Sequence, residues 1–237
     1  MENCDSQLTV CQLVAERKFG TIISIDGNIG TGKSSVMNSL QEGEDIMKEN
    51  EPVDQWTPWL GLFYEDMEGR QLGFQFKILM SYYKVLMDYP ITKNLVIERT
   101  PFTAWNIFAK ETPFLDEHER DLLREYVMEF GWLPDYWIYL QCDPAISYGR
   151  ISKRGREEEK GVSLDYIRLL HEKHEEVFNP KGIAVNPDEI LHYKKSRRFV
   201  VNANQGPGEV LEVVNAVLAF IIRDIEIPRR YKLITVE

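Results

Sequence analysis

The residues whose types and spacing best fit a chemical role form one glycine-rich segment near the start of the chain. Its eight positions are Gly27, Asn28, Ile29, Gly30, Thr31, Gly32, Lys33 and Ser34. This run fits the phosphate-binding pattern G-x-x-x-x-G-K-[ST] without a mismatch. In such a loop the backbone N–H groups surround a polyphosphate, the lysine adds a positive charge, and the hydroxyl can ligate Mg²⁺. The segment therefore predicts a site for a nucleoside triphosphate.

The sequence on either side of the loop favours this interpretation over a chance glycine-rich turn. The preceding run Thr21–Ile25 is β-branched and apolar, as a buried parallel strand is. The following run Ser35–Leu40 can open a helix whose N-terminus faces the anion. A strand, a loop and a helix thus follow one another in the order that the site needs. Ser35 is included among the residues expected to bind ATP.

Two predicted strand ends carry charged side chains that suit phosphoryl transfer. Glu51 follows a short strand at Ile46–Glu49, where its carboxylate could accept a proton from an attacking hydroxyl. The strand Leu95–Glu98 ends in the adjacent charges of Glu98 and Arg99. Taken alone, a surface turn is the default interpretation of Glu51, and a plain ion pair fits the Glu-Arg sequence as well as a catalytic role does.

Three arginines lie close together further along the chain. Arg150 and Arg154 are four residues apart and share one helix face, whereas Gly155 would end that helix and start a loop that carries Arg156. Guanidinium groups that converge on a transferring phosphoryl group stabilise the charge on its equatorial oxygens. A charged, solvated helix end is the alternative, and this segment alone does not exclude it.

These motifs together resemble the deoxynucleoside kinases, the family of deoxycytidine, deoxyguanosine and mitochondrial thymidine kinases and of the insect multisubstrate enzyme. The motifs are Glu-Pro-Val-x-x-Trp at 51–56, Glu-Arg-Thr at 98–100, Arg-x-x-x-Arg-x-Arg with following glutamates at 150–159, Tyr-Leu-Gln at 139–141 and Gly-Val-Ser-Leu-Asp-Tyr at 161–166. The similarity covers residues 20–178 and, more loosely, extends to 220. It implies a P-loop kinase fold, ATP as the phosphate donor, Mg²⁺ as the metal, and a homodimer.

The resemblance also implies roles for the residues around the phosphate loop. Glu51 is the expected general base for a 5′-hydroxyl, and Arg99 is expected beside that base. Ser34 and Glu98 are the expected Mg²⁺ ligands, and Lys33 is expected to act in catalysis. The expected lid arginines are Arg150, Arg154 and Arg156. Of these, Arg150 and Arg154 are also expected to bind ATP.

Further residues are expected, by the same resemblance, to bind a deoxynucleoside. Glu159 and Tyr64 would bond the sugar 3′-hydroxyl, and Gln75 would pair with the edge of the nucleobase. The residues expected to line the pocket are Ile29, Trp56, Phe74 and Phe108, the last stacking on the base. Because an amide carries both a donor and an acceptor, Gln75 can bind a pyrimidine edge in two orientations.

Two positions near the base bear on the choice of nucleoside. Deoxycytidine kinase has an Arg seven residues after the glutamine and an Asp six residues after the glutamate of Glu-Arg, where this chain has Tyr82 and Ala104. An uncharged pair, with room at Ala104 for a 5-methyl group, favours thymidine, with deoxycytidine as an additional substrate. Tyr82 departs from the Met of thymidine-accepting members, and it either contacts the base or narrows the pocket.

The elements that must position these residues alternate between strands and helices. Further strands are predicted at Tyr136–Gln141 and Phe199–Val201, and helices over Leu72–Leu86, Glu117–Phe130 and Ser163–Phe178. The alternation predicts an α/β fold with a parallel, helix-covered sheet whose ligands gather at the carboxyl ends of the strands. The resemblance specifies five strands in the order 2-3-1-4-5 and an Arg-rich lid.

The composition restricts the class of protein. The 237 residues suit a single domain, predicted over 1–237 with a core at about 20–222 and terminal extensions at 1–19 and 223–237. A net charge of −10 argues against a non-specific nucleic-acid binder. The three cysteines show no CxxC spacing, which favours a reducing compartment. The sequence also shows no leader and no long apolar run, so we expect a cytoplasmic protein without a membrane partner.

Two other functions compete with nucleoside phosphorylation. A thymidylate kinase shares the sheet, the phosphate loop and the lid, but needs a basic site for the phosphate of its acceptor. Glu51, Glu159 and Tyr64 suit a neutral sugar instead. A GTPase switch or a non-catalytic nucleotide-binding module is the second alternative. The former would carry an Asn-Lys-x-Asp sequence, which this chain lacks, and the latter would be expected to lose Glu51 or the lid arginines.

Overall fold

The computed structural model describes residues 20–88, 93–110, 112–156, 159, 161–179, 197–224 and 234–236. They group into two compact units. The helical unit comprises Pro52–Lys93 and Thr100–Trp132, and the sheet unit comprises Thr21–Glu51, Asn94–Arg99 and the described residues from Leu133 onward. The single domain expected over residues 1–237 stays a prediction.

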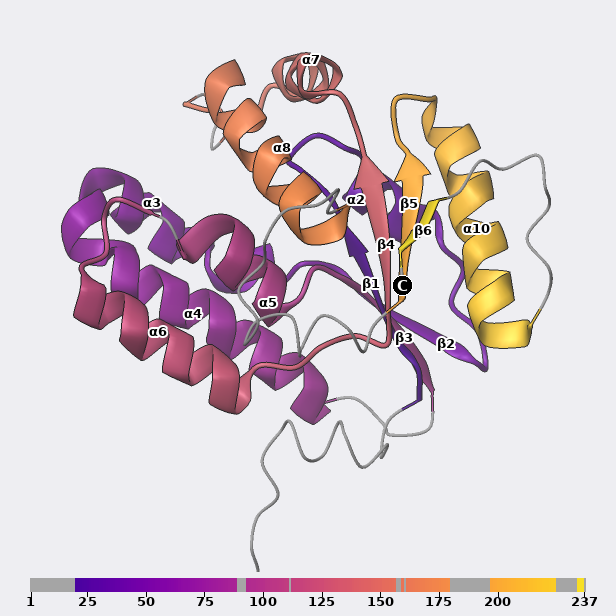
Figure 1. The fold of residues 1–237 in the computed structure, drawn as a ribbon, viewed down its shortest axis with the longest axis horizontal. Coiled ribbons are helices and arrows are strands. Elements are labelled where there is room, and N and C mark those ends of the chain that lie inside the picture. Colours follow the sequence, from indigo (N-terminus) through magenta and orange to yellow (C-terminus); the bar gives the residue numbers. More distant parts are fainter. Residues whose placement is uncertain are drawn as a thin grey trace, which may run out of the picture. The chain divides into compact units, whose positions relative to one another are not determined.

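A parallel β-sheet forms the centre of the sheet unit (Figure 1). Its parallel strands are β1 (Ile22–Asp26), β2 (Ile46–Glu49), β3 (Asn94–Glu98), β4 (Tyr136–Gln141) and β5 (Arg197–Asn202). They lie in the order β2-β3-β1-β4-β5, as predicted. A sixth strand, β6 (Ile234–Val236), pairs antiparallel with β5 inside the segment expected to be a terminal extension. The sequence analysis did not predict β6.

One face of this sheet packs against α2 (Lys33–Ser39) and α10 (Pro207–Arg223). The core between them is built from aliphatic side chains, among them Val36, Ile138 and Val214, each at most 3% exposed. Alternate residues of a strand point to opposite faces, so Ile138 and Leu140 of β4 both enter this core. The core fixes the position of β1 and α2, and therefore of the loop between them.

The other side chains of β4 pack against α8 (Leu164–Phe178), which follows α7 (Pro144–Arg154). Trp137 meets Phe178 edge to face at a centroid distance of 5.7 Å, and Tyr139 stacks on the same ring at 5.1 Å. Ser163 caps α8 by accepting a hydrogen bond from the backbone N–H of Tyr166. α8 therefore has a fixed start and an aromatic attachment to the sheet.

Helices make up the helical unit. They are η1 (Val53–Gln55), α3 (Thr57–Glu65), α4 (Met67–Asp88), α5 (Pro101–Thr103), the π-helix η2 (Ala104–Ala109) and α6 (Glu117–Phe130). α4 contacts α3, α5, η2 and α6. Asp116 and Glu119 form a capping box at the start of α6. α4 and α6 contain the predicted helices, whereas the π-helix was not predicted.

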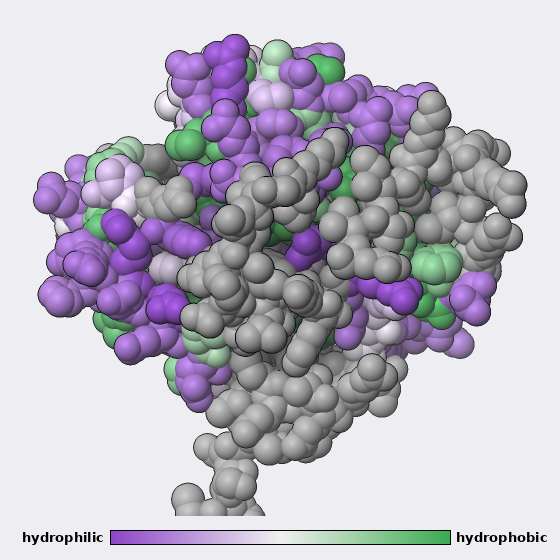
Figure 2. Space-filling view, viewed as in Figure 1, coloured by the Kyte–Doolittle hydropathy of each residue, from purple (hydrophilic) through white to green (hydrophobic). Residues whose placement is uncertain are grey.

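Hydrophilic residues predominate on the face drawn in Figure 2, where apolar residues form only small groups among those coloured. Across the described ranges, no helix is both long enough and apolar enough to cross a membrane.

Candidate active site

The phosphate loop runs from the end of β1 to the start of α2. Gly30 and Gly32 have φ angles of 80° and 99°, which side chains rarely adopt. A Cβ atom at Gly30 would lie 2.5 Å from the carbonyl oxygen of Ser147, so only glycine fits there. A Cβ atom at Gly32 would meet nothing within 4 Å. The space beside Gly32 is therefore open to a ligand such as a phosphate group.

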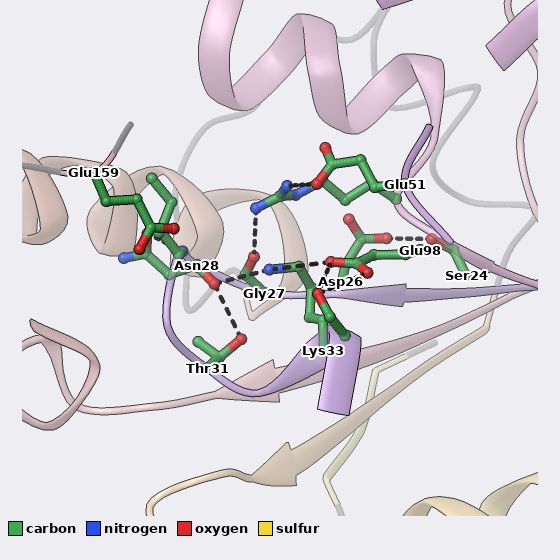
Figure 3. A network of polar contacts seen from close by, with 12 residues as sticks. Ser24, Asp26, Gly27, Asn28, Thr31, Lys33, Glu51, Glu98 and Glu159 are labelled. Atoms are coloured by element: carbon green, nitrogen blue, oxygen red, sulfur yellow. Dashed lines mark hydrogen bonds and ion pairs between the residues drawn. The ribbon is translucent and has the colours of Figure 1, made fainter. Parts of the chain in front are cut away.

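Lys33 lies beside this loop and is 5% exposed. Its Nζ donates a hydrogen bond of 2.9 Å to the carbonyl oxygen of Asn28 and lies 3.8 Å from Oε1 of Glu98. Burial lowers the pKa of Lys33 to about 8, and the cation of Arg99 lowers it too, against the opposing effect of nearby carboxylates. These carboxylates, drawn in Figure 3, belong to Asp26, Glu51 and Glu98.

Ser34 and Glu98 bring hard oxygen atoms together across 64 residues of sequence. The hydroxyl of Ser34 lies 3.3 Å and 3.1 Å from the two carboxylate oxygens of Glu98. Neighbouring ligands in an octahedral Mg²⁺ shell stand about 2.9 Å apart, so the pair fits such an ion. Within the described ranges, no group of three His, Cys, Asp or Glu side chains could hold a metal. Mg²⁺ commonly uses one or two carboxylates together with substrate phosphates, so Ser34 and Glu98 could hold it.

Glu51 and Arg99 form an ion pair at the carboxyl ends of neighbouring strands. Nη1 of Arg99 donates to Oε2 of Glu51 at 2.5 Å, and Nη2 lies 3.4 Å from the carbonyl oxygen of Gly27 in the phosphate loop. The backbone of Arg99 has a φ of 65°, the left-handed region that costs a non-glycine residue about 1 kcal/mol or more. The fold thus keeps a strained residue that holds the Glu51 carboxylate beside the loop.

Asn28 connects the phosphate loop to α8. Its Nδ2 donates a 2.8 Å hydrogen bond to the carbonyl oxygen of Ile167, and its Oδ1 accepts from the N–H of Ile29 at the same distance. Asn28 is 2% exposed, and its own carbonyl oxygen also accepts from the hydroxyl of Thr31 at 3.0 Å. The side chain therefore points into the protein, and the carbonyl that holds Lys33 depends on the position of α8.

A polar network in turn attaches α8 to β4. The carboxylate of Glu175 accepts hydrogen bonds from Tyr139 at 2.7 Å, from Gln141 at 2.9 and 2.8 Å, and from Asn179 at 2.9 Å. Burial alone would raise the pKa of Glu175, but these hydrogen bonds outweigh it and lower the pKa. Burial lowers the pKa of the neighbouring His174 to about 3, so this ring is neutral at physiological pH.

A pocket of about 270 Å³ adjoins the phosphate loop within the sheet unit. Its lining includes Gly30, Thr31, Gly32, Ser35, Arg150 and Gln205. Arg150 holds two walls together: it donates to the carbonyl oxygens of Ala203 and Gln205, each at 2.9 Å, and reaches that of Thr31 at 3.5 Å. The pocket thus extends from the loop towards the start of α10, where a nucleotide could place its base.

The other expected lid residues lie at and after the end of α7. Gly155, with a φ of 65°, ends this helix as predicted. Arg154 is exposed and forms an ion pair with Glu159, in which Nε lies 3.1 Å from Oε2. Arg156 is exposed as well. Arg154, expected to bind phosphate, and Glu159, expected to bind the sugar, are therefore paired with each other in this structure.

The residues expected to contact a nucleobase lie in the helical unit. Gln75 and Phe74 of α4 are buried, and Phe74 stacks on Phe63 at 5.0 Å. Trp56 is buried with its ring 6.1 Å from that of Tyr82, which is fully buried. Ala104 and Phe108 both lie on η2, and π-helical turns occur frequently at functional sites. The side chain of Tyr64 lies outside the described part of the chain.

The comparisons with known proteins bear on the same segments. The model of the deoxynucleoside kinase family matches residues 23–218. This chain belongs to the deoxynucleoside kinase family. The matched segment contains the phosphate loop, the Glu51–Arg99 pair and the lid, as the resemblance seen in the sequence implied.

Individual relatives within this family carry different names. The chain is 36% identical over 172 residues, or 69% of its length and 86% of the relative's, to putative kinase protein 029R of Invertebrate iridescent virus 3. It is 33% identical over 211 residues to the probable deoxycytidine kinase FPV151 of Fowlpox virus, which covers 82% of this chain and 86% of the relative. It is 32% identical over 170 residues to the thymidine kinase of Ictalurid herpesvirus 1, which covers 66% of this chain and 73% of the relative. The names therefore do not decide the nucleoside.

Sequence reasoning missed some residues of this kinase-family site. Asp26 is the last residue of β1, is fully buried, accepts a hydrogen bond from Ser24, and its charge raises the pKa of Lys33. Its position at a strand end next to the loop is the signal that could have found it. Gln71 of α4, which is 3% exposed, was not singled out in the sequence either.

Proposed function

We propose that this protein is an ATP-dependent deoxynucleoside kinase that transfers the γ-phosphoryl group to the 5′-hydroxyl of a deoxynucleoside. The observation that carries the proposal is the Glu51–Arg99 pair, held 2.5 Å apart beside the phosphate loop. A carboxylate in this position can receive the proton of an attacking hydroxyl next to bound phosphates. Membership of the deoxynucleoside kinase family supports the same reaction.

In the proposed reaction, the 5′-oxygen forms a bond to the γ-phosphorus while the bond to the β–γ bridging oxygen breaks and ADP leaves. The hydroxyl proton passes to Glu51, and Arg99 holds that carboxylate in place. Lys33 leaves the carbonyl oxygen of Asn28 and binds the phosphate oxygens. Arg154 and Arg156 on the exposed lid stabilise the charge that develops on the transferred group.

Mg²⁺ would be held by Ser34 and Glu98, and when bound it neutralises charge on the phosphate oxygens. Arg150 has a second task in this proposal, since its bonds to the carbonyl oxygens of Ala203 and Gln205 shape the ATP pocket. The loop residues 27–35 supply the remainder of the ATP site. Ile29 borders the nucleoside in this scheme.

We propose thymidine as the favoured acceptor and deoxycytidine as an additional one. The support is the uncharged character of Tyr82 and Ala104, which are 0% and 5% exposed. Gln75 reads the base edge, and the aromatic rings of Trp56, Phe74 and Phe108 enclose the base. Glu159 and Tyr64 bind the 3′-hydroxyl of the sugar. The homodimer and the cytoplasmic location expected from the sequence remain part of the proposal.

Turnover of the four deoxynucleosides and of thymidylate, each with ATP and Mg²⁺, tests the proposal. Thymidine and deoxycytidine should react, and thymidylate should not react in preference to thymidine. Glu51→Gln should lower kcat by roughly 10²–10⁴-fold with little change in the Kd of ATP, as expected on loss of a general base. Exclusive turnover of deoxyguanosine, or an unchanged kcat in Glu51→Gln, would contradict the proposal.

A further inference from the structure

Gln71 is a buried amide whose side-chain oxygen is not satisfied by the described part of the protein. It lies on α4 and is 3% exposed, and its Oε1 is buried without a hydrogen-bond partner among the described residues. Folded proteins rarely keep such an oxygen, because a buried acceptor that has lost its water destabilises the native state. An external donor that binds at this position would satisfy it.

The neighbours of Gln71 on α4 indicate which ligand brings that donor. Gln71, Gln75 and Tyr82 are separated by four and seven residues, so they share one face of the helix. Gln75, also buried, is the residue proposed to read the nucleobase. Side chains four apart on a helix have Cβ atoms about 5–6 Å from each other. A flat base bound to Gln75 therefore comes within reach of Gln71.

The hydrogen-bond requirements of cytosine match two such amides. Its exocyclic amine has two N–H donors, of which Gln75 can accept one while donating to the ring nitrogen. The second N–H needs another acceptor, and the side chain of Ala104 has none. Two oxygens that accept from both hydrogens of one amine stand about 5 Å apart for N···O distances near 2.9 Å. This separation agrees with the spacing of Gln71 and Gln75.

We propose that Gln71 is a specificity-determining residue that accepts a hydrogen bond from the exocyclic amine of the acceptor nucleobase. The proposal rests on the deoxynucleoside kinase function proposed above, and it explains how deoxycytidine is accepted without a charged residue at positions 82 and 104. Thymine has a carbonyl oxygen in place of the amine. A carbonyl with one unused lone pair is tolerated better than an unpaired N–H, so thymidine depends less on Gln71.

The test compares kcat/KM for deoxycytidine and thymidine in wild-type protein and in Gln71→Leu. The substitution should lower kcat/KM for deoxycytidine by about tenfold or more, and that for thymidine by less than about threefold. The Tm without ligand should stay the same or rise, because the unsatisfied oxygen is gone. Gln71→Glu keeps an acceptor and loses the donor, so its ratio of deoxycytidine to thymidine kcat/KM should be at least that of the wild type.

Ser81→Ala is the matched control on the same helix. Ser81 is 1% exposed, but its hydroxyl already donates to the carbonyl oxygen of Ile78 at 2.6 Å, so this change should leave the ratio unaltered. An equal loss for both nucleosides in Gln71→Leu, an unchanged ratio, or a fall in Tm would overturn the role of Gln71. Wild-type protein that phosphorylates neither nucleoside would instead contradict the proposed function, and this role with it.

Discussion

Raising the pH from 7 to 9 should weaken the binding of ADP, because Lys33 loses its proton over that range. Its pKa is about 8 in the absence of nucleotide, mainly because the side chain is buried. About nine in ten molecules then carry a protonated Lys33 at pH 7 and about one in ten at pH 9. If only the protonated form binds phosphate, the affinity falls roughly tenfold.

Titration calorimetry with ADP and Mg²⁺ at pH 7, 8 and 9 measures this loss directly. Bound phosphates favour the charged lysine, so binding at pH 8 should take up about half a proton, which a comparison of buffers with different ionisation enthalpies detects. A phosphate group has its last pKa near 6, so the nucleotide itself does not titrate between pH 8 and 9.

Lys33→Arg is the control, because a guanidinium stays charged throughout this range. Its affinity for ADP should not fall between pH 7 and 9, whatever its value at pH 7. In Arg99→Leu the pKa of Lys33 should rise, since a neighbouring cation that lowers it has been removed, and the loss of affinity should move to higher pH. Wild-type affinity that is constant to pH 9, with no proton uptake at pH 8, would refute the reasoning.

Two further predictions concern the connection of the loop to α8 and the sugar site. Asn28→Asp should lower the free energy of unfolding by about 1–3 kcal/mol in urea denaturation, because a carboxylate cannot donate to the carbonyl oxygen of Ile167. Asn38→Asp at an exposed position is its control, and equal effects would contradict this explanation. Glu159→Gln should lower kcat/KM for thymidine by about tenfold or more, but should have no such effect with 3′-deoxythymidine. Equal losses for both nucleosides would mean that the change acts through its ion pair with Arg154 instead.

The parts of the site that sequence reasoning reached are those encoded in short runs of residues. The phosphate loop is one contiguous run of residues. The local geometry of the loop decides which residue type fits at the positions of its glycines, lysine and serine. Glu51 and Arg99 are 48 residues apart in the sequence, and the resemblance to the kinase family implied their proximity, for which the sheet gives a physical reason. Both come just after parallel strands, and the ends of neighbouring parallel strands lie at the same edge of a sheet.

The parts that sequence reasoning missed depend on pairing in space. A glutamine in an amphipathic helix carries no sign that its oxygen is buried and unsatisfied, so Gln71 was not distinguishable from a surface residue. The π-helix at Ala104–Ala109 differs from an α-helix by one residue in its hydrogen-bond spacing, which an apolar run does not reveal. The strand β6 has three residues, too few for a periodic pattern, and it exists because β5 provides a partner.

The antiparallel strand β6 has a consequence for solubility. Without it, β5 would present a row of unpaired backbone groups beside the apolar residues Phe199, Val200 and Val201, a surface on which other chains could aggregate. At the opposite edge, β2 has only four residues and includes Lys48, whose Nζ is bound to the last carbonyl oxygens of α2. One edge is thus protected by an added strand and the other by shortness and charge. Variants that end before Ile234 should fold around the same phosphate loop but self-associate.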